Sequence, residues 1–495
     1  MSHHKPDPNK NVNLIIDGIP VTVPEGTRIL EAARKVDVHI PTLCDHPDLC
    51  KRAVCRLCVV ECDGRGKLIA ACANDVWEGV SIVTHNARLL SIRKMIIELL
   101  LANHPQDCLS CIRSTNCTLQ SLAADFGIRE SPFRHDAADL RPPVTESATL
   151  VRDMAKCVKC GRCVEACQEV QTIRAINTSH RGTHYEISAP YGQALADGAC
   201  VFCGQCAAVC PVGAIYEHDQ SAEAWIALND KDRRVAVQFS PSLSEAVDNA
   251  LNLPAGTATP GRIVTALKRL GFDQVFNAQS FADAATAEEH NELSNRISGG
   301  STPPLPLITG CSAGCIKFVE NFYPDLANRL GACKTTPQTF STLVKKANPQ
   351  TSAISICGCL AQKFTCRSAP NDTLALTVNE LARMFTLGGI NFDGLPETPF
   401  DTFAGAPTET TASPAEYKDV QPGIQAAEIS VKGKQIKMLI AHGFAPARVI
   451  LDSISKGECD AGLVKIMSCP KDSSCPCGGF GSLKQRRCVT VALLR

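Results

Sequence analysis

The pattern of apolar positions at the start of the chain changes from the period of a strand to that of a helix. Residues 12–24 form two β-rich runs, and the pair Asp17-Gly18 between them indicates a tight β-hairpin. The apolar positions that follow favour a helix extending through Val36, with Thr27 as its N-cap. The chain is therefore expected to begin with a small sheet and a short helix.

From about Arg233 onward, the pattern alternates between strands and helices. RRVAVQFSPSLSEAV predicts a strand followed by a helix, and GRIVTALKRLGFDQVF predicts a helix that ends at Gly271 and precedes a strand. Further helices are expected at ELARMF and ILDSI. This alternation favours an α/β domain. A high density of Pro, Thr, Ala and Glu between Asp393 and Gln425 predicts a loose linker within it.

Length, charge and cysteine content narrow the class of protein. A chain of 495 residues should form several domains, and its zero net charge implies no nucleic-acid partner. The N-terminal residues MSHHKPDPNK lack an apolar signal core, and the longest apolar run, around Met95–Ala102, is interrupted by Glu98 and too short to span a membrane. The 28 cysteines therefore indicate metal or redox chemistry in the reducing cytoplasm rather than disulfides.

The first group of cysteines has the spacing of a two-iron site. Three thiols in one loop and a fourth after a short strand match the way thiolates surround a [2Fe–2S] cluster. The expected ligands are Cys44, Cys55, Cys58 and Cys72. Cys50 and Cys62 are interpreted as ordinary thiols.

The second group follows an apolar helix and includes a histidine. His104 stands four residues before a C-x2-C-x5-C run formed by Cys108, Cys111 and Cys117. This pattern resembles the ligation of a [4Fe–4S] cluster by one histidine and three cysteines in iron-only hydrogenases and in the large iron–sulfur subunit of complex I. An imidazole in place of a thiolate would change the charge of the cluster and its potential.

The third and fourth groups, CVKCGRCVEAC and CVFCGQCAAVC, share the spacing C-x2-C-x2-C-x3-C of bacterial two-cluster ferredoxins. In that pattern the last cysteine of each run binds the cluster of the other run, which a zinc site would not require. The expected sets are Cys157, Cys160, Cys163 with Cys210, and Cys200, Cys203, Cys206 with Cys167. Gly161 and Gly204 allow the tight turns. A row of such clusters moves single electrons, and no catalytic residue is expected among them.

The segment GRIVTALKRLGFDQVFNAQSFADAATAEEHNEL extends the likeness, and nearly the whole chain resembles an iron-only hydrogenase large subunit. This resemblance implies a multidomain α+β and α/β fold. It implies a plant-type [2Fe–2S] ferredoxin domain of the β-grasp type at 1–85, a one-histidine/three-cysteine [4Fe–4S] domain at 86–148, a two-cluster ferredoxin domain at 149–230 and a hydrogenase-like α/β domain at 231–495. In the family, the last domain holds an H-cluster, a cubane joined through cysteine to a two-iron unit with CO and cyanide ligands.

The first two loops that hold the H-cluster in the family are altered here. In TGCSAGC, Cys311 falls where the family has its proton-shuttling cysteine, whereas Ser312 falls at a cubane ligand and Cys315 at a tryptophan. In CGCLAQK, Cys359 keeps a ligand position, but Gln362 replaces a lysine that holds a cyanide. Cys357 replaces a methionine that packs on the site.

The third loop, KIMSCPKDSSCPCGGFG, is also altered. Cys469 keeps a ligand position, but Ser473 stands where the bridging cysteine is expected. Cys475 could serve only after a two-residue insertion. The glycine-rich segment that walls the two-iron pocket in the family is missing from the residues before this loop. The resemblance therefore implies that the two-iron unit has been lost.

The remaining thiols could hold an ordinary iron–sulfur cluster, either [4Fe–4S] or [2Fe–2S]. The chosen set is Cys311, Cys359, Cys469 and Cys475, with Cys315 or Cys477 as substitutes and Cys357 and Cys366 as further candidates. An empty thiol scaffold is the alternative. Cys333 and Cys488 are interpreted as incidental. Glu289, Glu292 and Arg296 match the family's proton route in spacing, but a solvated helix face is favoured.

The functional hypothesis is an electron-relay subunit of a soluble multisubunit oxidoreductase, as in NAD(P)-linked or electron-bifurcating hydrogenase complexes, with no H2 conversion of its own. The resemblance implies as partners a flavin- and NAD(P)H-binding subunit and a thioredoxin-like [2Fe–2S] subunit. A nickel–iron hydrogenase or a formate dehydrogenase is a further possible partner, as is soluble ferredoxin. The alternatives are an active iron-only hydrogenase, in which Cys311 delivers protons, and a redox sensor.

Overall fold

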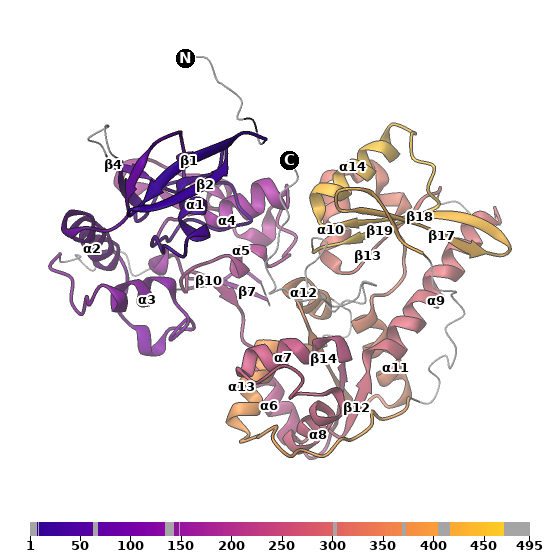
Figure 1. Ribbon diagram of the computed structural model, residues 1–495. Helices are drawn as coiled ribbons and strands as arrows, with labels where there is room; N and C mark the ends of the chain where they lie inside the picture. Colours follow the sequence, from indigo (N-terminus) through magenta and orange to yellow (C-terminus); the bar gives the residue numbers. More distant parts are fainter. Residues whose placement is uncertain are drawn as a thin grey trace.

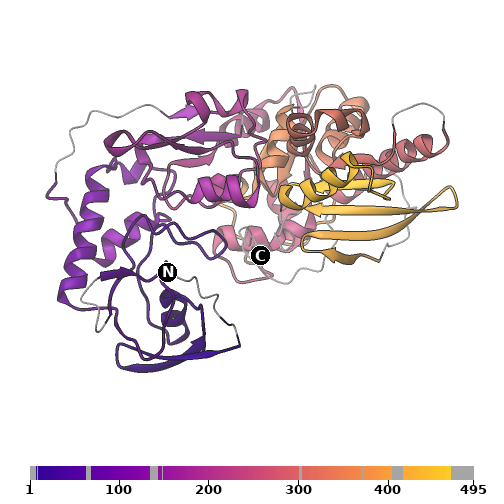
Figure 2. The ribbon, with the colours of Figure 1, turned by 90° about the horizontal axis from the view of Figure 1, so that it is seen from above.

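The computed structural model describes residues 7, 9–62, 68–133, 143–147, 149–299, 304–368, 373–403 and 416–469. Figure 1 shows an N-terminal sheet at one end, a central segment of short helices and strands, and two further sheets that form separate lobes of the C-terminal half. Seen from above in Figure 2, the central segment lies between the N-terminal sheet and the C-terminal half. The chain is therefore arranged as a row of parts in sequence order.

The N-terminal sheet has the strand order β2-β1-β5-β3-β4. Its strands are β1 (Asn11–Ile16), β2 (Ile19–Pro24), β3 (Val59–Cys62), β4 (Leu68–Ala70) and β5 (Ser81–Val83). The predicted hairpin is confirmed, with antiparallel β1 and β2 joined through Asp17 and Gly18 at φ values of 48° and 84°. Two successive positive φ values produce a turn whose twist matches that of the strands.

The helix after the hairpin is α1 (Ile29–Lys35), and its predicted ends were wrong. Its N-cap is Arg28, and Val36 is its C-cap. The Thr27 hydroxyl donates to the Pro24 carbonyl at 2.6 Å. Because that hydroxyl is used by the preceding turn, it does not cap the helix.

Two helices follow the N-terminal sheet, α2 (Ala87–Ala102) and α3 (Thr118–Asp125). The Asn86 side chain accepts from the Leu89 N–H at 2.8 Å and caps α2. Buried Arg93 donates to the carbonyls of Leu57 and Val59, which ties α2 to the cysteine loop before β3. None of the helices in the described part of the chain combines the length and apolar character that a membrane crossing requires.

The central segment contains the two cysteine runs. Its strands form a three-stranded sheet of order β10-β7-β6 and a β8–β9 hairpin. The elements are β6 (Val144–Thr145), β7 (Leu150–Arg152), α4 (Arg162–Glu165), β8 (Asn177–Ser179), β9 (Glu186–Ser188), α5 (Gln205–Ala208) and β10 (Ile215–Glu217). Buried Arg152 and Glu146 form an ion pair at 2.8 Å within this segment.

The first C-terminal sheet is parallel throughout, with the order β12-β11-β14-β15. Its strands are β11 (Arg234–Phe239), β12 (Gln274–Asn277), β14 (Thr351–Cys357) and β15 (Leu374–Thr377). The predicted strand–helix and helix–strand units are confirmed, including the end of α8 at Gly271, which has φ 108°. The helices of the C-terminal half are α6 (Ser221–Asn229), α7 (Ser244–Leu251), α8 (Pro260–Leu270), α9 (Ala278–Ile297), α10 (Ala313–Phe322), α11 (Thr336–Ala347), α12 (Leu360–Ser368), α13 (Val378–Leu387) and α14 (Phe444–Ser455).

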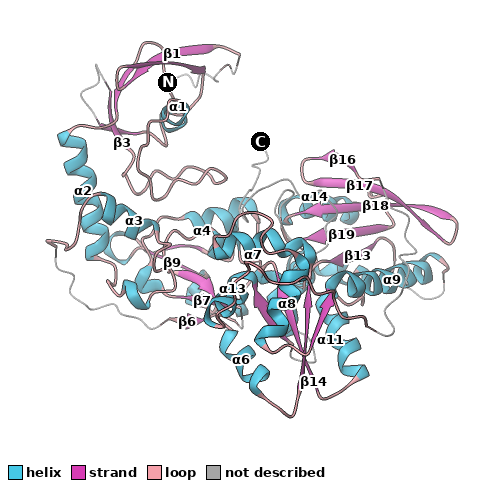
Figure 3. Ribbon diagram, turned by 60° about the horizontal axis from the view of Figure 1, so that its bottom comes forward, coloured by secondary structure: helices cyan, strands magenta, loops and turns pink. Residues whose placement is uncertain are grey.

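The second C-terminal sheet is mixed, with the order β13-β19-β18-β17-β16. Its strands are β13 (Leu307–Gly310), β16 (Lys418–Gln421), β17 (Ile424–Val431), β18 (Lys434–His442) and β19 (Leu463–Met467). Figure 3 shows helices beside both sheets, with α9 running along the second. The range 393–425, predicted as a loose linker, contains β16, and the Asp401 side chain within it accepts from the Val275 N–H at 2.7 Å.

Three of the parallel strands end at cysteine loops. β13 and β19 are neighbours in the second sheet and lead into Cys311 and Cys469, whereas β14 of the first sheet leads into Cys359. Ligand sites in open α/β sheets lie outside the carboxyl ends of such strands. The topology therefore brings loops from both lobes to one place.

A buried ion pair fixes α12, the helix after the second cysteine loop. The Lys363 ammonium lies 2.5 Å from a Glu380 carboxylate oxygen and donates to the His218 carbonyl at 2.6 Å, and both charged side chains are fully buried. Glu380 also accepts from the Gln220 and Thr377 N–H groups at 2.6 Å. These contacts tie α12, α13 and the end of the central segment together.

Lys363→Met should destabilise the first C-terminal lobe by about 3–5 kcal/mol, because it leaves the Glu380 carboxylate buried and unpaired. The measurement is urea unfolding followed by the fluorescence of Trp225, which packs on that lobe's core, in a Trp77→Phe background. Arg383→Met is the matched control, since Arg383 pairs with Asp219 in a half-exposed position and its loss should cost at most about 1 kcal/mol. Equal losses in the free energy of unfolding for the two variants would contradict the conclusion that the buried Lys363–Glu380 pair stabilises this lobe.

Candidate metal centres

The four cysteines predicted for the [2Fe–2S] site lie together in the N-terminal domain. Cys44, Cys58 and Cys72 are buried and Cys55 is half-buried. Hydrogen bonds from the Cys55 and Cys72 thiols lower the pKa of Cys44 to about 2, and a hydrogen bond from Cys72 lowers that of Cys58 to about 7. The sulfurs thus form one connected row, in the order Cys55, Cys44, Cys72 and Cys58. Four neighbouring thiols suit two irons with two thiolates each.

The second group includes a half-buried histidine just after the end of α2. Burial lowers the pKa of His104, which keeps its imidazole neutral. Its buried Nδ1 has no hydrogen-bond partner among the described residues. The half-buried thiols of Cys108, Cys111 and Cys117 lie near one another. An unpaired buried ring nitrogen is unfavourable unless something binds it, so this site fits a metal cluster.

The cysteine runs form two separate groups, in the interleaved arrangement expected from their spacing. A cavity beside β10 is lined by Cys157, Cys160, Cys163 and Cys210, together with apolar side chains such as Met154. Burial raises the pKa of Cys157 to about 11 and that of Cys160 to about 12. The fourth group consists of Cys200, Cys203 and Cys206 together with Cys167. The last cysteine of each run thus lies with the first three of the other.

Both runs use the same backbone turn to present their sulfurs. Lys159 and Gly161 have φ values of 54° and 78°, and Phe202 and Gly204 have values of 52° and 78°. The Lys159 N–H donates to the Cys157 sulfur at 3.4 Å, and the Phe202 N–H donates to that of Cys200 at 3.5 Å. Hydrogen bonds to ligand sulfurs are one determinant of a cluster's reduction potential.

The first three groups share one apolar core. Cys55 of the first group, Cys117 of the second, and Cys157 and Cys210 of the third pack against the same buried cluster of residues. A Cβ atom at Gly213 would lie only 2.8 Å from the Cys111 sulfur, so the chain after Cys210 passes directly over the second group.

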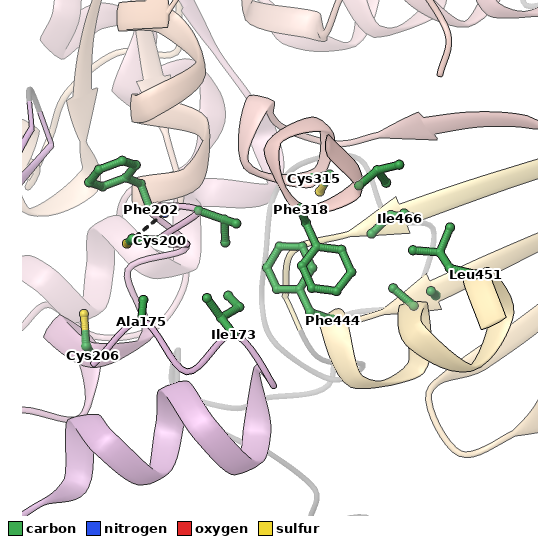
Figure 4. Packing of buried hydrophobic residues seen from close by; sticks show 14 of the residues in the cluster. Ile173, Ala175, Cys200, Phe202, Cys206, Cys315, Phe318, Phe444, Leu451 and Ile466 are labelled. Carbon is green, nitrogen blue, oxygen red and sulfur yellow. Dashed lines mark hydrogen bonds between the residues drawn. The ribbon is translucent and has the colours of Figure 1, made fainter. Parts of the chain in front are cut away.

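A second core connects the runs with the C-terminal half. It contains Cys200 and Cys206 as well as Cys315, and Figure 4 shows the first two on one side and Cys315 on the other. The backbones approach closely here, since a Cβ at Gly314 would lie 2.5 Å from the Val201 carbonyl oxygen. A Cβ at Gly204 would lie 2.7 Å from that of Leu360. The fourth group is therefore in contact with the first two C-terminal cysteine loops.

Four thiols converge at the carboxyl ends of β13, β14 and β19. The Cys311 sulfur lies 3.9 Å from that of Cys315, and Cys469 forms a hydrogen bond with Cys359. Ser468 joins the two pairs, since its N–H donates to the Cys311 sulfur at 3.3 Å and its hydroxyl lies 4.0 Å from the sulfur of Cys469. Three of the predicted residues, Cys311, Cys359 and Cys469, are thus brought together.

Other candidates of the C-terminal half are placed elsewhere. Cys475, Cys477 and Cys488, and Ser473, lie outside the described residues. Buried Cys357 faces buried Cys366, with 4.0 Å between their sulfurs, and Cys357 is also close enough to Cys359 to interact with it electrostatically. The Cys333 thiol donates to Glu292 at 2.9 Å.

The solvated helix face favoured for α9 was wrong. Glu289 and Arg296 are 7% and 9% exposed, respectively, and Glu292 pairs with Arg296 at 2.5 Å. Lys465 of β19 pairs with Glu289 at 3.3 Å.

In the N-terminal domain, the two leftover thiols have different surroundings, since Cys50 is exposed and Cys62 is buried.

Two features of the C-terminal site were not found from the sequence. In the ligand set predicted from the sequence, Cys315 is only a substitute, and Ser468 has no place. The spacing of Cys311 and Cys315 was the available signal, because residues four apart around the first turn of a helix lie on one face. The helices α10 and α12 also begin at this site, next to Ser312 and Cys359.

The grouping of thiols does not suit single metal ions. Within the described ranges, no three His, Cys, Asp or Glu side chains are close enough to hold one ion. A zinc site needs four donors around a single point, whereas a cluster distributes its ligands over several irons. The donor sets therefore fit iron–sulfur clusters.

The interleaving predicts which signal each cysteine variant removes. Cys210→Ala should lose about four irons and the same EPR signal as Cys157→Ala, because one cubane would lose a ligand in both. Cys167→Ala should match Cys206→Ala instead. Iron analysis measures the number of irons lost by each variant, and EPR of the dithionite-reduced chain identifies the signal that is lost. A match between Cys210→Ala and Cys206→Ala would show that each run holds its own cluster.

Comparison with known families gives four matches along the chain. The description "2Fe-2S iron-sulfur cluster binding domain" matches residues 9–87, and "NADH-ubiquinone oxidoreductase-G iron-sulfur binding region" matches 93–132. The description "4Fe-4S dicluster domain" matches 146–214, and "Iron only hydrogenase large subunit, C-terminal domain" matches 233–479. The chain thus contains both [2Fe–2S] and [4Fe–4S] cluster domains.

Individual relatives agree with these matches. The alpha subunit of the NADPH-Fe(3+) oxidoreductase of Geobacter sulfurreducens is 35% identical over 41% of this chain and 24% of its own length. Iron hydrogenase 1 of Clostridium pasteurianum is 29% identical over 92% of this chain and 86% of that protein. The NADP-reducing hydrogenase subunit HndD of Solidesulfovibrio fructosivorans is 34% identical over 93% of this chain and 87% of that protein. The chain therefore belongs to the iron-only hydrogenase large-subunit family.

Proposed function

We propose that this chain is an iron–sulfur electron-relay subunit of a multisubunit NAD(P)-linked oxidoreductase, and that its hydrogenase-like domain no longer holds an H-cluster. The observation that carries the relay is the contact between successive cysteine groups. Two shared apolar cores connect the first group to the third and the fourth group to the C-terminal thiols. Iron–sulfur clusters bound in such a row would exchange single electrons along the chain.

The ligands that we propose are those predicted from the spacing. A [2Fe–2S] cluster would be held by Cys44, Cys55, Cys58 and Cys72, and a [4Fe–4S] cluster by His104, Cys108, Cys111 and Cys117. Two further [4Fe–4S] clusters would be held by Cys157, Cys160, Cys163 and Cys210, and by Cys167, Cys200, Cys203 and Cys206. The domain limits 1–85, 86–148, 149–230 and 231–495 remain part of this proposal, as does the β-grasp fold of the first domain.

The loss of the H-cluster is supported by what surrounds the expected ligand positions. Ser312 is fully buried, with its hydroxyl 3.5 Å from the Cys315 sulfur, and an alcohol is a poor ligand for soft iron. The Gln362 side chain accepts from the Gly358 N–H at 3.4 Å and offers no positive charge to a cyanide. The lysine that follows, Lys363, is held by Glu380. These residues do not fit a two-iron unit.

The partners follow from the relatives. The name of HndD describes a subunit of an NADP-reducing hydrogenase, which favours a partner that binds NAD(P)H and flavin and a thioredoxin-like [2Fe–2S] subunit. The terminal catalytic subunit would be a separate protein, such as a nickel–iron hydrogenase or a formate dehydrogenase, with soluble ferredoxin as a further partner. We place the complex in the cytoplasm of an anaerobic cell, where the thiols stay reduced, and electron bifurcation is one activity that it could serve.

The experiment exposes the anaerobic full-length chain to the hydrogenase maturation proteins and then examines it by infrared spectroscopy. We expect no CO or cyanide bands and no H2 evolution from reduced methyl viologen, while dithionite still reduces the N-terminal clusters, as seen by EPR. An active iron-only hydrogenase prepared in parallel is the control for maturation. CO and cyanide bands together with H2 evolution would overturn the loss of the H-cluster, and N-terminal clusters that dithionite cannot reduce would overturn the relay.

A further inference from the structure

We propose that the C-terminal domain holds a [2Fe–2S] cluster, with Cys311 and Cys315 on one iron and Cys359 and Cys469 on the other. This inference rests on the proposed relay function and adds a final site to it. The ligand set includes Cys315, which occupies no ligand position in the family, and it requires neither Ser312 nor Cys475.

The pairing of the sulfurs carries the inference. Two thiolates on one tetrahedral iron lie roughly 3.8 Å apart, given metal–sulfur bonds of about 2.3 Å. The Cys311 and Cys315 sulfurs are 3.9 Å apart. Cys359 and Cys469 form the second pair through their hydrogen bond. Two close pairs fit two irons with two thiolates each, whereas a cubane takes one thiolate at each iron.

The rest of the chain offers an internal comparison. In the N-terminal domain that matches a [2Fe–2S] family, the four thiols also form hydrogen bonds with one another, since Cys44 bonds to Cys55 and Cys72, and Cys72 bonds to Cys58. In the two cysteine runs, the hydrogen bonds of the sulfurs go to backbone groups, such as those of Lys159 and Val212. Among the described residues, the C-terminal thiols therefore resemble the first group and not the cubane groups.

The surroundings favour a negatively charged cluster. The N-termini of α10 and α12 meet at the site, with Ser312 as the N-cap of α10 and Cys359 directly before α12. Helix N-termini carry partial positive charge and stabilise anions. The Ser468 N–H adds a hydrogen bond to the Cys311 sulfur at 3.3 Å. Gly310 is required because a Cβ there would overlap that of Cys315.

The position gives this cluster a role in the relay. Cys203 of the fourth group lies close enough to Cys469 to interact with it electrostatically. Val201, next to Cys200, contacts Gly314 between the first two ligands. A cubane held by Cys167, Cys200, Cys203 and Cys206 and a [2Fe–2S] cluster held by the four C-terminal thiols would each supply one-electron redox chemistry, which would make the two sites neighbours in the relay. The hydrogenase-like domain would then provide the last site of the relay.

The test combines iron analysis with Mössbauer spectroscopy of the anaerobic full-length chain. The wild-type spectrum should contain two [2Fe–2S] components for every three [4Fe–4S] components. Cys315→Ala and Cys359→Ala should each lose about two irons and one [2Fe–2S] component. The EPR signals of the N-terminal clusters should remain, which separates this test from the relay proposal and reports folding.

Two controls sharpen the result. Cys333→Ala removes a thiol bound to Glu292 outside the site and should lose no iron. Cys475→Ala should also lose none, because the four described thiols complete the site. The proposal is overturned if Cys475→Ala loses iron while Cys315→Ala does not, if Cys315→Ala or Cys359→Ala loses about four irons, or if the wild-type spectrum holds a single [2Fe–2S] component.

Discussion

Burial of thiols from distant segments of the chain in shared apolar cores is the constraint on which the structure depends. Burial raises the pKa of the thiols in the cysteine runs, for example that of Cys160 to about 12, so the bare thiols would stay protonated at neutral pH. A metal cluster removes the protons and binds the thiolates, which couples metal binding to folding. Cys210 and Cys167 each lie with the opposite run, so two clusters bound by these thiols would cross-link the central segment.

The same constraint explains why successive cysteine groups lie next to one another along the chain. Each group of sulfurs needs an apolar surrounding, and neighbouring groups share it, so that Cys117 and Cys157 belong to one core and Cys206 and Cys315 to another. Glycines at the contacts, such as Gly213 and Gly314, let backbone and sulfur approach without side chains between them. Close approach of the cysteine groups is therefore a consequence of core packing.

The sequence predicted most of the local structure and the N-terminal groups, because those depend on short-range patterns. The hairpin at Asp17-Gly18 and the end of α8 at Gly271 follow from backbone preferences of single residues. The interleaving of the runs follows from spacing alone. The Thr27 cap failed because its hydroxyl bonds to the Pro24 carbonyl, a competition within three residues that the pattern does not reveal.

The C-terminal site was less predictable because it is assembled from two sheets. Comparison with family loops ranks residues by position, so Cys315 was predicted only as a substitute ligand, although the structure places its sulfur beside that of Cys311. Burial of Glu289 depends on Lys465 of β19, far away in sequence. Such contacts arise from the tertiary fold, and a helical spacing by itself cannot distinguish a covered face from a solvated one.

The central claim is that electrons pass through a row of thiolate-bound iron clusters that ends in the former hydrogenase domain without an H-cluster. Anomalous scattering at the iron edge from anaerobic crystals of the whole chain tests this most directly. The account predicts iron at five separate positions, the last a pair of irons among Cys311, Cys315, Cys359 and Cys469. A cubane joined to a two-iron unit in the C-terminal domain, or no iron there at all, would contradict it.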